Sequence, residues 1–320
     1  MKSVLWLAAF VAVISVYSRA QERSAITHIQ SNGWAKAENG MILSWRSMAS
    51  DAGSGQVDVS DRNGNHLVSL NLLRLVPEAS KVGISDVSAI PGLVAAAVAY
   101  VSKKGPAQVR PESALVLFDF SGNLISFLSV APWRNALRIE LDVDSNIWAL
   151  SSIADEAKAA SGSMLVEYSV KGAVLRELLP RASFPTHADE ILGNSEMGFT
   201  AMGRDTGIIW FWLPGSTEFV TVDTRGGAPS VTKTGIPSSN KPIRPVNFVR
   251  DNSGALIGQF SEENSSKAVY YRWSSSNNSW VQFEPGVCEG GWLVGHDDTE
   301  QIYLKLTKNN AVTSCAFGGR

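Results

Sequence analysis

The chain has 320 residues, of which 44% are apolar and 18% are charged, and it contains 27 glycines. This composition is typical of a globular protein with a large core, and it excludes a disordered or fibrous chain. The formal charge is −2 at pH 7, which argues against a protein that binds nucleic acid mainly through phosphate contacts.

The first twenty residues have the pattern of a secretory signal peptide. Lys2 supplies a positive charge, residues 4–16 are apolar, and Ala20 ends a small-x-small cleavage site. The apolar run is shorter than the roughly 20 residues that a bilayer span needs, and no later segment is long and apolar enough to cross a membrane. We therefore expect cleavage near Ala20 and a secreted or periplasmic protein, with residues 21–320 forming a single domain.

One kind of hairpin recurs along the rest of the chain. Its clearest copy is residues 114–128, ALVLFDFSGNLISFL, in which Ser121-Gly122-Asn123 separates two strand-forming runs. Successive copies are 50 to 58 residues apart, and such a period indicates a repeat architecture. The turns of the five copies contain Asn63-Gly64, Ser121-Gly122, Lys171-Gly172, Arg225-Gly226 and Ser276-Asn277.

A second kind of turn lies between these hairpins and precedes a strongly apolar strand. Six turns of this kind interleave with the five of the first kind, which predicts a repeating unit of two hairpins and four antiparallel strands. The second series consists of Asn39-Gly40, Pro91-Gly92, Asp144-Ser145-Asn146, Asp205-Thr206-Gly207, Asp251-Asn252-Ser253-Gly254 and Asp297-Asp298.

The repeat predicts an all-β fold, a six-bladed β-propeller with four-stranded antiparallel blades. The last unit has room for only three strands, and the segment 25–30 is available as a fourth. Pairing of this N-terminal strand with the last blade closes the ring and removes the edges that a linear array exposes. A seven-bladed ring and a pair of β-sandwiches explain the period less well. The six predicted units are residues 33–72, 82–130, 135–180, 196–233, 246–284 and 290–317.

Two segments resemble the repeats of the NHL-repeat and TolB-like six-bladed propeller families. Residues 143–148, VDSNIW, are similar to the inner hairpin of that repeat, and residues 118–122, FDFSG, are similar to the outer hairpin. The resemblance covers the chain after the leader and implies the fold, but it implies no particular activity.

Among six-bladed rings, the lactonase and esterase families hold calcium or a similar ion at the channel mouth through Glu, Asn and Asp side chains. By this resemblance the residues of matching type are Glu38, Asn194, Asn247 and Asp251. Glu38 and Asp251, however, fall beside the short hairpin turns, which we expect on the opposite face of the ring from the longer connections. The resemblance to a calcium site is therefore incomplete.

The two faces of the expected ring differ in their connections. Both series of short turns share one face, which we call the turn face, and the longer connections share the other, the long-loop face. Binding residues are usually carried by loops on a rigid scaffold, so we expect the ligand at the long-loop face. The longer connections are residues 46–56, 73–82, 103–113, 153–163, 180–190 and 234–245.

Three loop residues are candidate ligand-binding residues. Trp133 and Arg134 lie in APWRNA, and an aromatic ring beside a guanidinium suits a sugar, a peptide or an aromatic ligand. The alternative is a tryptophan wedged between blades beside a solvated arginine. His187 in FPTHADE suits a metal or acid-base role, and the alternative is an ordinary loop histidine.

Residues 137–144, LRIELDVD, alternate between charged and aliphatic side chains. The period of two places Arg138 and Glu140 on one face of the innermost strand of the third unit. Such a face either lines the central channel or pairs within the interface between blades. Both interpretations remain open.

Cys288 and Cys315 are the only cysteines, and such a pair in an exported protein first indicates a disulfide. Their expected strand positions put two strand spacings, roughly 10 Å, between them. Bridged Cα atoms lie within about 7 Å. A disulfide and two buried thiols both remain open.

The sequence contains no complete catalytic motif, and an enzymatic function is the less favoured interpretation. We predict a monomeric, secreted binding or interaction module for a protein, peptide or carbohydrate, without a cofactor, although a divalent ion such as calcium is compatible with it. The alternative is a metal-assisted hydrolase or lyase, lactonase- or esterase-like, with its site at the channel mouth.

Overall fold

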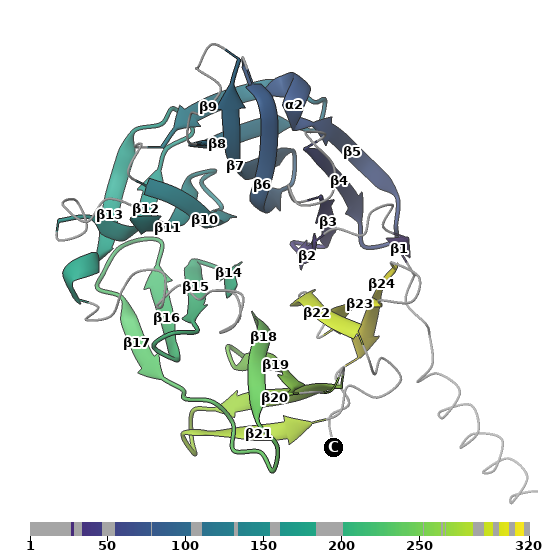
Figure 1. Cartoon of the computed structure of the whole chain (residues 1–320), viewed down its shortest axis with the longest axis vertical. Helices are drawn as coiled ribbons and strands as arrows, with labels where there is room; N and C mark the ends of the chain where they lie inside the picture. Colours follow the sequence, from purple (N-terminus) through teal and green to yellow (C-terminus); the bar gives the residue numbers. More distant parts are fainter. Residues whose placement is uncertain are drawn as a thin grey trace, which may run out of the picture.

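In the computed structural model of the chain, the sheets surround a central axis (Figure 1). The structure describes residues 27–28, 34–46, 55–77, 79–103, 111–130, 134–153, 161–183, 201–251, 253–263, 265, 267–283, 291–296, 301–306 and 311–316. The remaining residues, which include the expected leader, lie outside this description.

Nearly all of the regular structure is β-strand. The first strands are β1 (Thr27–His28), β2 (Trp34–Glu38), β3 (Met41–Trp45), β4 (Gln56–Asp61), β5 (His66–Asn71), β6 (Ala79–Ile90), β7 (Leu93–Ser102), β8 (Glu112–Asp119), β9 (Leu124–Ser129), β10 (Arg134–Leu141), β11 (Ile147–Ile153), β12 (Ser163–Tyr168) and β13 (Val174–Pro180). They are followed by β14 (Ala201–Asp205), β15 (Ile208–Leu213), β16 (Glu218–Asp223), β17 (Ser230–Lys233), β18 (Ile243–Arg250), β19 (Leu256–Glu262), β20 (Ala268–Ser274), β21 (Ser279–Phe283), β22 (Gly291–His296), β23 (Gln301–Leu306) and β24 (Ala311–Ala316). Helix α2 (Leu72–Leu75) and the short 3-10 helix η2 (Arg181–Ser183) follow β5 and β13.

The strands form an all-β propeller with four-stranded antiparallel blades, as the hairpin series predicts. The number of sheets differs from the expected six, because the described strands form five. Four sheets contain four consecutive strands each, β6–β9, β10–β13, β14–β17 and β18–β21. The fifth contains eight strands in the order β1-β24-β23-β22-β2-β3-β4-β5.

The eight-stranded sheet arises where β2 and β22 meet. These two strands pair in parallel through Ala37 and Gly295, whereas all the other pairs in the sheet are antiparallel. A Cβ atom on Gly295 would collide with the carbonyl group of Ala37, so the absence of a side chain permits this close approach. At the other end of the sheet, Thr27 of β1 pairs with Val312 of β24.

Within the described residues, the turns of both hairpin series form where the sequence predicts them, and the predicted turn at Asp297-Asp298 lies outside those residues. Asn39 and Gly40 both have positive φ angles, 51° and 70°, as a two-residue hairpin loop of the primed type requires. In four turns an aspartate closes the loop by accepting hydrogen bonds from backbone N–H groups two and four residues later. These residues are Asp61, Asp119, Asp142 and Asp251.

The strands nearest the axis in Figure 1 are β2, β6, β10, β14, β18 and β22. Each is the first strand of its hairpin group. β6, β10, β14 and β18 lie at a sheet edge, which carries backbone groups without a strand partner, whereas β2 and β22 pair with each other through Ala37 and Gly295. Side chains of the neighbouring group satisfy several unpaired backbone groups of the inner strands. Asp86 accepts from Ile139 N at 3.0 Å, Ser88 Oγ accepts from Leu141 N at 2.9 Å, and Gln259 Oε1 accepts from Leu293 N at 2.6 Å.

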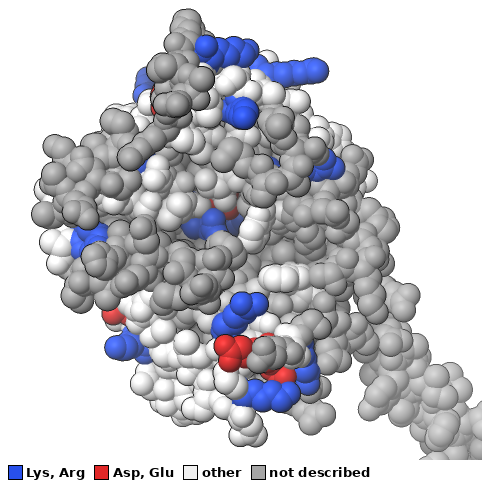
Figure 2. All heavy atoms as spheres, viewed as in Figure 1, with Lys and Arg blue, Asp and Glu red and all other residues white. Residues whose placement is uncertain are grey.

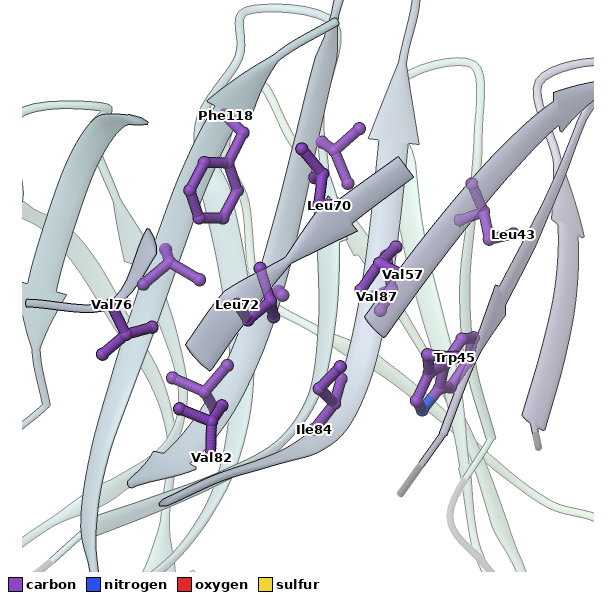
Figure 3. Packing of buried hydrophobic residues seen from close by; sticks show 14 of the residues in the cluster. Leu43, Trp45, Val57, Leu70, Leu72, Val76, Val82, Ile84, Val87 and Phe118 are labelled. Atoms are coloured by element: carbon purple, nitrogen blue, oxygen red, sulfur yellow. The ribbon is translucent and has the colours of Figure 1, made fainter. Parts of the chain in front are cut away.

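The core lies between neighbouring sheets. Figure 3 shows Leu43, Val57, Leu70 and other aliphatic side chains of β3–β5 packed towards Val82, Ile84 and Val87 of β6. Five tryptophans are also buried, namely Trp45, Trp148, Trp210, Trp212 and Trp273. Among the described residues there is no helix long and apolar enough to cross a membrane.

Candidate functional site in the central channel

Several candidate residues lie outside the described part of the chain. These are Trp133, His187, Asn194 and Cys288. Cys315 belongs to β24, where its backbone pairs with Ile302. Neither the ligand-binding expectations for Trp133 and His187 nor the disulfide expectation is therefore tested by the structure.

Arg134 is not the loop residue that the sequence suggested. It is the first residue of β10 and is only 3% exposed. Its Nη1 donates a hydrogen bond to the carbonyl oxygen of Ser163 at 2.7 Å. The strand starts one residue before the expected unit 135–180, and the guanidinium is buried against β12 instead of being presented to solvent.

Arg138 and Glu140 lie on the same strand, near the axis. Arg138 is half-buried, and its Nη1 donates to the carbonyl oxygens of Leu137 at 2.9 Å and of Ser85 at 3.3 Å. Glu140 is fully buried. Its carboxylate forms an ion pair with Lys36 of β2 and accepts a hydrogen bond from Ser88 Oγ of β6 at 3.2 Å.

The ion pair of Glu140 belongs to a cluster contributed by three inner strands. Lys36 lies between Glu140 and Glu38, with its Nζ 3.1 Å from Glu38 Oε2. Glu38 also accepts from the backbone N–H of Ala89, and Asp86 lies close enough for its charge to act on Lys36. Figure 2 shows basic and acidic atoms together at the centre of the ring. We call Lys36, Glu38, Asp86, Ser88 and Glu140 the channel cluster.

The pKa values of the cluster follow from burial and from these charges. Burial by itself lowers the pKa of Lys36, but the negative charges of Glu140, Glu38 and Asp86 outweigh it and hold the pKa above its usual 10.5. Burial, and next the charge of Glu38, raise the pKa of Glu140 well above 4.5, although Lys36 opposes them. Lys36 therefore stays protonated at neutral pH and is unsuited to act as a nucleophile or base.

The channel cluster is built to connect strands. Glu38, Asp86 and Glu140 each accept a hydrogen bond or form an ion pair across two inner strands. Removing one partner of such a buried carboxylate strongly lowers the stability of the folded state. Among the described residues there is no group of three or more His, Cys, Asp or Glu side chains arranged to hold a metal ion.

Two of the described candidates for a calcium site, Asp251 and Glu38, do not fit that ion. Asp251 Oδ1 accepts from Ser253 and Ala255, and its Oδ2 lies 2.6 Å from Arg272 Nη2. Glu38 is held by Lys36 and by the N–H of Ala89. These contacts use the oxygen atoms that calcium would need. Asp142, Asp144 and Asn146 form a hydrogen-bonded turn, with the carboxylate of Asp142 accepting from both backbone N–H groups.

Two exposed tryptophans lie at the other end of the inner strands, near the long-loop face. Trp34 begins β2 and is 43% exposed, and Trp292 is the second residue of β22 and is 48% exposed. Neither these residues nor Lys36 and Asp86 were singled out from the sequence. The available signal was the alternation in WAKAE, residues 34–38, which repeats the pattern of residues 137–144.

The comparisons with known proteins give no family. No family model matches the chain, and no curated protein matches it. Among solved structures, a protein of unknown function from Bacteroides caccae is 11% identical with a TM-score of 0.49, and the match covers 84% of this chain and 83% of that chain. A streptogramin B lyase is 14% identical with a TM-score of 0.45, covering 92% and 98%. The β-propeller domain of Cps50 (Swd1) from Myceliophteria thermophila is 12% identical with a TM-score of 0.42, covering 91% and 98%. Likenesses at this level say nothing about what the chain does.

Proposed function

We propose that the protein is an exported, monomeric six-bladed propeller that binds a protein, peptide or carbohydrate at its long-loop face. The eight-stranded sheet counts as two blades in this proposal, β2–β5 and β22–β24 with β1, joined by the Ala37–Gly295 pair. The pairing of β1 with β24 then closes the ring. The turn motifs support a place in the NHL-repeat and TolB-like superfamily, and the leader supports export.

One contrast along the inner strands carries the proposal of a binding function. Their carboxylates near the turn face are buried or half-buried and engaged with other parts of the chain, whereas Trp34 and Trp292 are exposed at the long-loop end. Catalysis requires ionisable groups that can reach a substrate. Binding requires exposed aromatic side chains on a rigid frame, and this is what the described residues offer.

The experiment is to purify residues 21–320 and to screen them on glycan and peptide arrays. We expect retention of a ligand that is weakened by Trp133→Ala or His187→Ala at the long-loop face. The matched control is Val143→Ala, because Val143 is 64% exposed in a turn at the opposite face. Retention that is lost with Val143→Ala but not with the loop variants would refute the choice of face.

Metal content separates this proposal from the hydrolase or lyase alternative. Elemental analysis of the purified protein is expected to show no tightly bound divalent ion, and treatment with chelator is expected to leave ligand retention unchanged. A stoichiometric ion whose removal abolishes hydrolysis or elimination of an ester or lactone would favour the enzyme and contradict the binding module.

A further inference from the structure

A hydrogen bond joins two inner strands on opposite sides of the axis. Arg204, the fourth residue of β14, donates through Nη2 to Asn39 Oδ1 in the β2–β3 turn at 2.5 Å, although the two residues are 165 positions apart. In Figure 1, β6 and β10 lie between β2 and β14 on one side of the centre, and β18 and β22 lie between them on the other. A side chain cannot pass around two intervening strands, so this contact crosses the axis.

Asn39 is held in place on its own side of the ring. Its backbone has a φ of 51°, and its Nδ2 donates to the carbonyl oxygen of Ala89 in β6 at 2.8 Å. The amide therefore has a fixed orientation, with Oδ1 directed at the guanidinium. Among the described residues, Asn39 is the one hydrogen-bond partner of the Arg204 side chain. We call the contact between Asn39 and Arg204 the brace.

The channel cluster lies next to the brace along the axis. Lys36 precedes Asn39 by three residues, and its ion pair with Glu140 also joins inner strands that are not neighbours, β2 and β10. The Lys36 Nζ donates as well to the carbonyl oxygen of Ile139 at 3.4 Å. Side chains of β2 and of the turn after it thus reach β6, β10 and β14, and the contacts with β10 and β14 pass through the centre of the ring.

We propose that the brace and the channel cluster together close the turn-face end of the channel. The brace lies at the mouth, because Asn39 belongs to a turn of that face and Arg204 is next but one to the turn at Thr206-Gly207. The buried ion pair of Lys36 and Glu140 lies behind it. A ligand that reaches the centre of the ring then has to enter from the long-loop face. This inference concerns the channel itself and does not depend on the proposed binding function.

Cross-linking tests whether the brace joins the two sides of the ring. The double variant Asn39→Cys and Arg204→Cys is treated with bismaleimidoethane, and the joined peptides are identified by mass spectrometry. We expect a link within one chain. The matched control combines Arg204→Cys with Asn63→Cys, because Asn63 also precedes a glycine in a turn but lies between β4 and β5, farther from the axis (Figure 1). No link from position 39, or equal linkage from position 63, would overturn the inference.

Thiol labelling tests the closure itself. Ser88 belongs to the channel cluster and is fully buried, so the thiol of Ser88→Cys is expected to react slowly with a methanethiosulfonate reagent. Addition of Arg204→Met removes the brace, and we expect labelling to become about tenfold faster. The control is Val143→Cys, at a position that is 64% exposed in a turn of the same face. Its labelling rate should be the same with and without Arg204→Met.

The melting temperature of each variant separates closure from stability. Asn39→Gly keeps the positive φ but removes both side-chain contacts, so it opens the brace in a second way. An unchanged labelling rate of Ser88→Cys in both brace variants, or a rate as fast as that of Val143→Cys while the brace is intact, would overturn the closure. A lower melting temperature without faster labelling would assign the brace to stability alone and contradict a closed channel end.

Discussion

The guanidinium carbon of Arg176 lies 4.6 Å from the centre of the Trp148 ring. The same side chain pairs with Glu167 at 2.5 Å and donates to the carbonyl oxygen of Asp223 at 3.3 Å in the next sheet. One arginine on an outer strand therefore combines a cation–π contact, an ion pair and a connection between two sheets. Its neighbour Glu167 is only 4% exposed.

We expect Arg176→Met to lower the free energy of unfolding by about 2–3 kcal/mol, because it removes the cationic partner of the buried Glu167 and leaves that carboxylate with the hydrogen bond from Asn146 Nδ2. Urea unfolding followed by tryptophan fluorescence measures the change. Arg225→Met is the matched control, since Arg225 also pairs with an acid, Asp223, but is 85% exposed. Its urea midpoint should stay unchanged; equal losses in both variants would contradict the role of burial.

Glu140 should make the protein less stable as the pH rises. Its pKa is higher in the folded chain than the 4.5 of an ordinary Glu, so above pH 4.5 the folded state binds more protons than the unfolded state. The contribution of this group to stability is therefore full below about pH 4.5 and declines towards the folded-state pKa. Lys36 acts in the same direction above pH 10.5, because its pKa is also raised.

Glu140→Gln removes this titration, and we expect its destabilising effect to become smaller as the pH rises. The urea midpoints of the variant and of the unchanged protein at pH 5, 6.5 and 8 give the comparison. Two curves that run parallel over this range would show that Glu140 does not titrate there. The control variant is Glu177→Gln, at an exposed position of β13.

Gly295→Ala is expected to separate β2 from β22. The new Cβ atom would meet the Ala37 carbonyl, and relief of such an overlap in a packed sheet costs about 1–3 kcal/mol. Val143→Ala is the comparison, because Val143 is 64% exposed and lies outside β2 and β22. Hydrogen exchange should accelerate in β2 and β22 for Gly295→Ala only. Unaltered exchange in both strands would mean that the junction tolerates a methyl group.

The turn aspartates should respond to pH in the opposite sense to Glu140. The pKa of Asp119 is lowered below 3.8, first by the side chain of Asn123 and then by backbone N–H groups. Its stabilising effect is present above pH 3.8 and is lost as the pH falls through the lowered value. A carbon NMR titration should show Asp61, Asp119 and Asp223 titrating below the usual range; ordinary values would contradict the hydrogen-bonded turns.

The hairpins could be predicted from the sequence because their causes are local. Residues such as Gly122, with φ of 82°, adopt a backbone conformation that few other residues tolerate. The strand alternation that placed Arg138 and Glu140 on one face of β10 is local as well. These features depend on residues a few positions apart, so they can be predicted from the amino-acid sequence alone.

The channel cluster could not be predicted in the same way. Lys36 and Glu140 are 104 positions apart and come from β2 and β10, with β6 between them in the chain. Their pairing depends on how the whole ring curves, and no local sequence pattern predicts that curvature. The burial of Arg134 likewise depends on the position of Ser163 in another strand. The merging of β2 and β22 into one sheet depends on Gly295, whose neighbour Ala37 lies at the far end of the chain.

The pairing of β1 with β24 also bears on how the molecule is assembled during synthesis. Thr27 is synthesised well before its partner Val312. The intervening hairpins contain mainly contacts between consecutive strands and are free to form in order as they emerge. β1 must therefore wait for β24, and until β24 has been synthesised the nascent chain carries an unpaired strand edge, which is when protection by a chaperone has the greatest value.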